Sequence, residues 1–116
     1  MLADETRDYL LSKKSATEET PFGPDVLVYK IGEMKMFATL GLEDEIGRTN
    51  LKCDPERAID LRQEHDAILP GWHMNKKHWN TLVLDGSLKP ALVRELIDHS
   101  YDLVVTSLTK KQREAL

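Results

Sequence analysis

The sequence has very little cysteine, and this excludes a disulfide-stabilised fold. Cys53 is the single cysteine among 116 residues, so the chain cannot form an intramolecular disulfide. A small domain without disulfides depends on its hydrophobic core, and a chain of this length can bury roughly two-thirds of its unfolded surface. We therefore expect one domain over residues 1–116, with no need for an oxidising compartment.

Long apolar runs are also lacking. No stretch approaches the roughly 20 apolar residues that a membrane-spanning helix needs. The N-terminus begins Met1-Leu2-Ala3-Asp4-Glu5, which is acidic and lacks the apolar segment of a signal peptide. These absences predict a cytoplasmic protein that does not enter a membrane, and we expect it to be a monomer.

Signatures of catalysis and metal binding are missing from the sequence as well. There is no Cys-x-x-Cys or His-Glu-x-x-His pattern. Gly41 and Gly47 flank acidic residues, which would repel phosphate. His73 and His78 are five residues apart, a spacing that places them on opposite faces of a continuous strand. Cys53 falls on the apolar face of its expected strand, which predicts a buried, inert thiol. We expect no catalytic residue, no metal site and no cofactor.

The hydrophobic periodicity that is present predicts an α+β domain. Short connections make the first three strands an antiparallel meander. Helices on one face of such a sheet would give a two-layer domain, with an antiparallel sheet of about four or more strands. In chain order we expect a helix at 3–14, strands at 26–31 and 34–40, an acidic loop at 41–47, a strand at 48–53, a helix at 54–65 capped by Asp54, a strand at 78–84, a helix from Pro90 with a break or new cap at Ser100, and a last short helix capped by Thr109.

Alternation within two of these strands predicts which side chains share a face. Trp79 shares a face with Thr81 and Val83, and we expect its indole to lie in the core. The strand at 34–40 has one face made of Lys35, Phe37 and Thr39 and another made of Met34, Met36, Ala38 and Leu40.

The segment from Trp72 to Trp79, WHMNKKHW, combines cations, hydrogen-bond donors and aromatic rings. Lys76 and Lys77 can neutralise phosphates, and an indole can stack on a base. His73, Asn75 and His78 can donate to phosphate or sugar oxygens. Residues 67–89 have three basic residues and one acidic residue, whereas the whole chain has a net charge of −4. This pattern favours a nucleic-acid surface; the alternative is a solvated turn beside a tryptophan in the core.

Further cations could extend this surface if the fold brings them to the same side. Lys30 and Lys35 belong to the first predicted hairpin, Lys52 to the third strand and Arg62 to the helix that follows. Lys35 lies in an otherwise apolar strand, so its ammonium group must reach solvent or a partner. Each cation taken singly is equally typical of an ordinary exposed face.

Several specific motifs lie along nearly the whole chain. The most specific is the block Pro70-Gly71-Trp72-His73-Met74-Asn75-Lys76-Lys77-His78-Trp79. The supporting motifs are Pro21-Phe22-Gly23-Pro24, Lys35-Met36-Phe37, Leu51-Lys52-Cys53, Leu84-Asp85-Gly86 and Ser100-Tyr101. Together they resemble the motifs of the MmcQ/YjbR family, and this resemblance implies a compact fold similar to the frataxin-like (CyaY-like) group, with paired hairpins that resemble a double wing and a family label of DNA-binding.

These observations predict a small nucleic-acid-associated protein that contacts the DNA backbone through a basic hairpin surface. Binding would be weak and show little sequence preference, because few phosphates are neutralised and the net charge of −4 repels DNA. The alternative is a protein-interaction or small-anion-binding module, in which the same segment would bind an acidic peptide or a metabolite anion. An enzyme has the least support. The predicted contact residues are Lys76, Lys77, His73, Asn75, His78, Lys35, Lys52 and Arg62.

Overall fold

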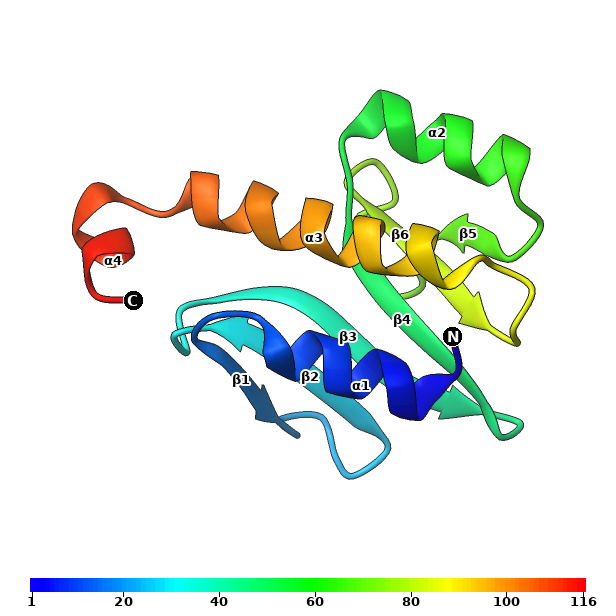
Figure 1. Ribbon diagram of the computed structural model, residues 1–116, viewed down its shortest axis with the longest axis horizontal. Coiled ribbons are helices and arrows are strands. Elements are labelled where there is room, and N and C mark those ends of the chain that lie inside the picture. The colour runs from blue at the N-terminus through cyan, green and yellow to red at the C-terminus, as the bar shows by residue number, and fades with distance from the viewer.

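A computed structural model describes residues 1–116 of the chain, apart from the side chain of Glu43. Over this part of the chain, four helices accompany a six-stranded sheet of order β1-β2-β3-β4-β6-β5 (Figure 1). Every pairing in the sheet is antiparallel. The elements are α1 (Ala3–Ser12), β1 (Ala16–Glu19), β2 (Val26–Ile31), β3 (Lys35–Glu43), β4 (Ile46–Lys52), α2 (Pro55–Glu64), β5 (Ile68–Pro70), β6 (Trp79–Leu84), α3 (Pro90–Ser107) and α4 (Lys110–Glu114).

The helices lie on one side of the sheet, which confirms the predicted two-layer α+β architecture. Helices α1 and α3 cross the same face, and α2 packs beside β5 and β6 (Figure 1). The core fills the space between the two layers, with Leu10 from α1, Phe37 from β3, Leu82 from β6 and Ile97 from α3. This arrangement leaves the opposite face of the sheet uncovered by helices.

Two helix starts form as the sequence predicts. The Asp54 side chain accepts a hydrogen bond from the Arg57 N–H, and Pro55 takes the first position of α2, where its missing N–H costs nothing. Thr109 and Gln112 form a capping box at the start of α4. These helices are specified locally, by residues within one turn of each start.

The break expected at Ser100 is wrong, because α3 runs unbroken from Pro90 to Ser107. Ser100 is fully buried within this helix. Its hydroxyl donates to the Phe37 carbonyl at 2.6 Å and accepts from the Lys52 N–H at 2.8 Å. The hydroxyl therefore bonds to the sheet across the layer instead of capping a new helix.

Strands β1 and β5 were not predicted, and both are short edge strands. Strand β1 has the sequence ATEE and pairs only with β2, while β5 ends at Pro70 and pairs only with β6. Neither shows the alternation of a half-buried strand, and each is specified by its pairing with a neighbouring strand. The proline on β5 also removes a donor at the edge of the sheet.

The acidic loop expected at 41–47 is instead mostly strand. Strand β3 continues to Glu43 and β4 begins at Ile46, which leaves Asp44 and Glu45 as a two-residue turn. Both turn residues have positive φ, 52° and 67°, as a type I′ hairpin turn requires. The twist of the two strands favours this tight turn although neither residue is glycine.

The alternation predicted for the strand at 34–40 is wrong because β3 contains a bulge. Tyr29 pairs with Ala38, but Lys30 pairs with Met36, so Phe37 is an extra residue. Phe37 turns toward α3, where its ring meets Tyr101 edge to face at 5.4 Å. Met36 lies instead on the uncovered side of the sheet, on the same side as Thr39.

Candidate functional site

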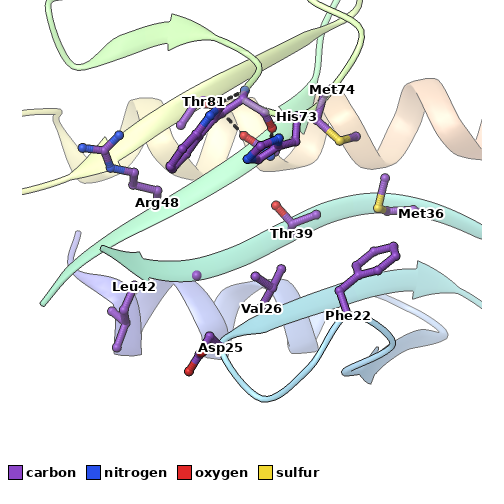
Figure 2. Close-up of a pocket in the computed structure, with 13 residues that line it drawn as sticks. Phe22, Asp25, Val26, Met36, Thr39, Leu42, Arg48, His73, Met74 and Thr81 are labelled. Carbon is purple, nitrogen blue, oxygen red and sulfur yellow. Dashed lines mark hydrogen bonds between the residues drawn. The ribbon is translucent and has the colours of Figure 1, made fainter. Parts of the chain in front are cut away.

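A pocket of about 620 Å³ lies on the uncovered face of the sheet. In Figure 2 the lining side chains stand in front of the strands and the helices lie behind them. The floor includes a row of three polar residues in register across neighbouring strands, namely Thr39 on β3, Asn50 on β4 and Thr81 on β6. Strand alternation therefore supplies the floor, since the residues before and after each of these three along its strand point to the helices.

Two connections form the walls of the pocket. The segment between β1 and β2 provides Phe22 and Asp25, and the loop between β5 and β6 provides Trp72, His73 and Met74. Phe22 is 78% exposed and Trp72 is 49% exposed. Large apolar side chains gathered around one hollow are typical of a binding site. The volume also falls within the range of about 300–1,000 Å³ that is usual for small-molecule sites.

The wall that contains Trp72 is held by the floor of the pocket. The Trp72 N–H donates to the Thr81 hydroxyl at 2.9 Å, and the Asn50 amide donates to the Trp72 carbonyl at 3.1 Å. The Thr81 hydroxyl in turn donates to the Asn50 side-chain oxygen. These three bonds fix both polar groups of the Trp72 peptide backbone, so the indole stands over the sheet in a defined position.

Gly71 allows the chain to approach the sheet closely at the start of this loop. Its N–H donates to the Trp79 carbonyl at 2.9 Å. A Cβ at this position would lie 2.7 Å from the Trp79 Cβ and 2.8 Å from the Trp79 carbonyl oxygen. No other residue fits here without displacing backbone, so glycine sets the path of the loop.

The rings of Trp72 and His73 form a stacked pair at the pocket wall. Their centroids are 4.9 Å apart and their planes differ by 20°. The Arg48 guanidinium lies 5.9 Å from the centroid of the Trp72 ring. His73 has a φ of 60°, in the left-handed region that costs a non-glycine residue about 1–3 kcal/mol. The hydrogen bonds of the adjacent Trp72 peptide compensate for this strain, so the sequence specifies the conformation of this wall.

The electrostatic character of the pocket is nearly neutral. Among the lining residues that the structure describes, Asp25 provides one carboxylate and Arg48 one guanidinium. The other lining side chains are apolar, apart from His73 and the polar floor. Such a surface favours an uncharged ligand with a large apolar part.

Three of the predicted cations meet at the loop between β5 and β6. The Arg62 guanidinium reaches from α2 and donates to the Lys76 carbonyl at 3.1 Å and to the Asn80 side chain at 2.9 Å. The Lys76 ammonium donates to the Gly71 carbonyl at 3.1 Å. Lys77 is exposed. Arg62 and Lys76 thus also hold the main chain of this loop.

The remaining predicted contact residues are distributed more widely. The Lys35 ammonium donates to the carbonyl and hydroxyl of Ser107, both at 3.2 Å, at the end of α3, so this cation is not at the loop. Lys52 pairs with Trp79 across β4 and β6. Within the loop the Asn75 side chain accepts from the Lys77 N–H, His78 is half-buried, and His73 lines the pocket.

Trp79 is half-buried and not in the core as expected. It lies next to Asn80, whose side chain points to α2 and donates to the Ala58 carbonyl at 3.2 Å. Trp79 therefore shares the face of Thr81, which lines the pocket. Alternation along β6 was predicted correctly, but the buried face is the other one.

Most of the pocket was missed by the sequence analysis. Met36 was assigned to the wrong face, and neither Asn50 nor Arg48 was considered. One signal was present for Phe22, because a large apolar ring between Pro21 and Gly23 in a turn has little chance of reaching the core.

Other groups with reactive or ligating potential lie away from this pocket. Cys53 is buried, as predicted, and burial raises the pKa of its thiol. Within the part of the chain that the structure describes, no three histidine, cysteine or acidic side chains are grouped to hold a metal ion. Among the described helices, none is long and apolar enough to cross a bilayer.

Known proteins resemble this chain over nearly its whole length. The YjbR family model matches residues 11–103. The uncharacterized protein YjbR of Escherichia coli K12 is 32% identical over 116 residues, which cover 100% of this chain and 98% of that protein. The uncharacterized protein YbdF of Escherichia coli O157:H7 is 39% identical over 94 residues, which cover 81% of this chain and 76% of that protein.

Solved structures agree with the sequence relationship. The crystal structure of Deinococcus radiodurans protein DR2400 superposes with a TM-score of 0.89 at 38% identity and covers 98% of this chain and 86% of that one. A crystal structure of a Pseudomonas syringae protein gives a TM-score of 0.78 at 29% identity and covers 89% of this chain and 98% of that one. The predicted resemblance is confirmed, and the chain belongs to the YjbR family.

Proposed function

We propose that this protein is a binding protein for a small molecule, which it takes up in the pocket on the uncovered face of the sheet. The observation that carries the proposal is the pocket of about 620 Å³ with exposed Phe22 and Trp72 on its walls. Exposure of these apolar side chains to water costs free energy. A ligand that covers them is therefore stabilised by the burial of its own apolar surface and of theirs.

Preorganisation of the pocket supports the same function. The peptide groups of Trp72 are bonded to Asn50 and Thr81, and Gly71 is bonded to Trp79. A ligand that enters such a site does not have to order the wall first, so less of the interaction energy is lost to conformational entropy. The loop geometry therefore favours binding to a preformed site.

The test of this function is to fill the pocket and measure binding by NMR. Val26 lines the pocket and is half-buried, so Val26→Trp should occupy its space. The matched control is Ile59→Trp, which adds the same side chain on α2, at a residue that is 49% exposed. The probes are uncharged alcohols of one and two rings, both aromatic and aliphatic, and the readouts are the Trp72 indole N–H and the His73 amide.

We expect some probes to shift these signals in the native protein and in Ile59→Trp, but not in Val26→Trp. Binding that survives in Val26→Trp, or shifts confined to other surfaces, would contradict the proposal. The indole N–H of Trp79, which does not line the pocket, provides an internal reference in every spectrum.

The second candidate is the weak nucleic-acid binding that the sequence predicts for a cytoplasmic protein with a winged surface. It is supported by the meeting of Arg62, Lys76 and Lys77 at one loop. Few phosphates would be neutralised there, so affinity should fall steeply as salt is added.

Titration of labelled duplex DNA at low salt tests this candidate. The variant Lys76→Ala/Lys77→Ala should bind more weakly than the native protein. The matched control is Lys110→Ala/Lys111→Ala in α4, which removes the same charge elsewhere on the surface. Equal affinities for the two double variants would reject a specific role for the loop.

A further inference from the structure

We infer that the pocket selects planar aromatic rings, and that it holds such a ring between Phe22 on one wall and the stacked Trp72–His73 pair on the other. This inference rests on the proposed function, because it names the class of molecule that the same pocket binds. It goes beyond apolar binding, because a saturated molecule of equal size would be excluded or held less tightly.

The first support is the placement of aromatic rings on opposite walls. Phe22 extends from the connection between β1 and β2, and His73 from the loop between β5 and β6, so they approach the pocket from two sides (Figure 2). Phe22 makes no ring contact within the described part of the chain, whereas Trp72 and His73 already stack at 4.9 Å. A flat ligand would extend that pair and give the Phe22 ring a partner.

The second support is the pair of thioethers at the same end of the pocket. Met36 on β3 and Met74 on the loop both line it, near Phe22 and His73 (Figure 2). Sulfur is polarizable and makes favourable contacts with aromatic rings, often at the ring edge. Two aromatic walls with sulfur atoms beside them therefore suit a flat aromatic ring.

The third support is the charge of the lining. The described charged groups are one carboxylate, Asp25, and one guanidinium, Arg48, so neither sign dominates. An ionic ligand would lose its hydration without a surplus of opposite charge to replace it. An uncharged ring with a single donor on its edge fits better, because the Asp25 carboxylate can accept from that donor.

A matched pair of probes tests the inference. The pair is 2-naphthol and trans-decahydro-2-naphthol, which share their carbon skeleton and hydroxyl but differ in flatness and aromaticity. Saturation adds apolar surface, so hydrophobic burial alone would favour the decahydro compound. Because one aromatic contact changes affinity by about two- to tenfold, we expect 2-naphthol to bind about tenfold more tightly in calorimetry.

Variants at Phe22 separate the aromatic contact from simple burial. Phe22→Leu keeps an apolar side chain at a site that is 78% exposed, so the fold should be unaffected. We expect it to weaken 2-naphthol by about fivefold and the decahydro compound by less than about twofold, since only 2-naphthol loses an aromatic contact. Phe22→Tyr retains the ring and should restore the affinity for 2-naphthol.

The outcomes distinguish this inference from the proposed function. If both compounds shift the Trp72 and His73 signals and bind equally well, the pocket takes small molecules but the aromatic preference is overturned. The preference is also overturned if Phe22→Leu weakens both compounds alike. If neither compound, nor any probe of the first test, perturbs the pocket, both proposals fail together.

Discussion

The two faces of the sheet are built from the same strands, yet they differ in what is left exposed. On the helix-covered face Phe37 is fully buried and packs against Tyr101 of α3. On the uncovered face Phe22 is 78% exposed at the rim of the pocket. One phenylalanine contributes to the core and the other remains available to a ligand. The comparison teaches that apolar content by itself does not separate core residues from residues that line a pocket.

Polar groups on the two faces differ in a similar way. Ser100 connects α3 to the sheet through the Phe37 carbonyl and the Lys52 N–H. Thr81 connects the pocket loop to the sheet through the Trp72 N–H and the Asn50 side chain. The first set of bonds holds the two layers together, and the second holds the wall of a pocket. Removal of the Ser100 hydroxyl should therefore change stability, and removal of the Thr81 hydroxyl should mainly change binding.

The largest expected difference in stability is between variants that truncate one or the other of the two phenylalanines. Phe37→Ala should lower the free energy of unfolding by about 3–5 kcal/mol, because it leaves a cavity in the core. Phe22→Ala should change it by less than about 0.5 kcal/mol, since this ring is exposed. Urea denaturation followed by circular dichroism measures both. Similar losses for the two variants would break the comparison between the faces.

The next effect concerns the glycine that positions the pocket loop. Gly71→Ala should lower stability by about 2–3 kcal/mol and displace the Trp72 indole signal, because the new Cβ meets the Trp79 backbone. Gly86→Ala is the control. Gly86 has a φ of 89°, and a Cβ there would meet only the Leu2 side chain in ordinary contact at 4.0 Å, so Gly86→Ala should lose only about 1 kcal/mol for backbone strain. A Gly71→Ala variant with native stability and native NMR signals would contradict the role of this close approach.

Removing one hydroxyl from each face sharpens the contrast further. Ser100→Ala should lower stability by about 1–2 kcal/mol, because the buried Phe37 carbonyl loses its donor and the Lys52 N–H loses its acceptor. Thr81→Val should have a smaller effect on stability, since Trp72 is 49% exposed and water can replace the lost acceptor, but it should loosen the wall and weaken binding of 2-naphthol. Thermal unfolding and calorimetry, applied to both variants, measure the two quantities. If Ser100→Ala weakens binding of 2-naphthol as much as Thr81→Val does, the two faces do not differ in their contribution to binding.

The smallest effect is a dependence on pH at the edge of the covered face. The Arg7 guanidinium bonds to Glu18 and holds the pKa of that carboxyl below its ordinary value of 4.5, with a further hydrogen bond from Tyr29. A lowered pKa in the folded state adds stability above pH 4.5, and this is lost as the pH falls through the folded value. Glu18→Gln should therefore be less stable than the native protein at neutral pH, and the difference should shrink in acid.

Denaturation midpoints across an acidic pH series check this dependence. A difference between the two proteins that stays constant from neutral pH to well below 4.5 would show that the Glu18 charge contributes nothing to the pH response.

Much of the covered face could be predicted, because its signals are local. The cap at Asp54 and the capping box at Thr109 start helices where the sequence predicts them. The three-strand meander followed from short connections. The prediction failed where a distant partner decides the structure. Ser100 continues a helix because the sheet satisfies its hydroxyl, and Phe37 turns to the core because β2 and β3 pair with a bulge.

The candidate site was predicted only in part. The segment from Trp72 to Trp79 attracted attention for its cations and aromatics, and it does supply one wall of the pocket through Trp72 and His73. Lys76 of this segment and Arg62 of α2 hold main-chain carbonyls of the loop. Whether the predicted contact residues bind DNA stays a prediction. The other wall and the floor come from segments that no sequence spacing connects to this one.

The sequence by itself determined that the chain would form an α+β domain around one core, since periodicity and capping act over a few residues at a time. It also determined the family. The tertiary structure alone decided that the helices would cover one face and leave the other open, with Phe22 and His73 on two sides of a pocket. The physical reason is that a pocket depends on the register of distant strands and the path of two loops, and a bulge or a single glycine changes both.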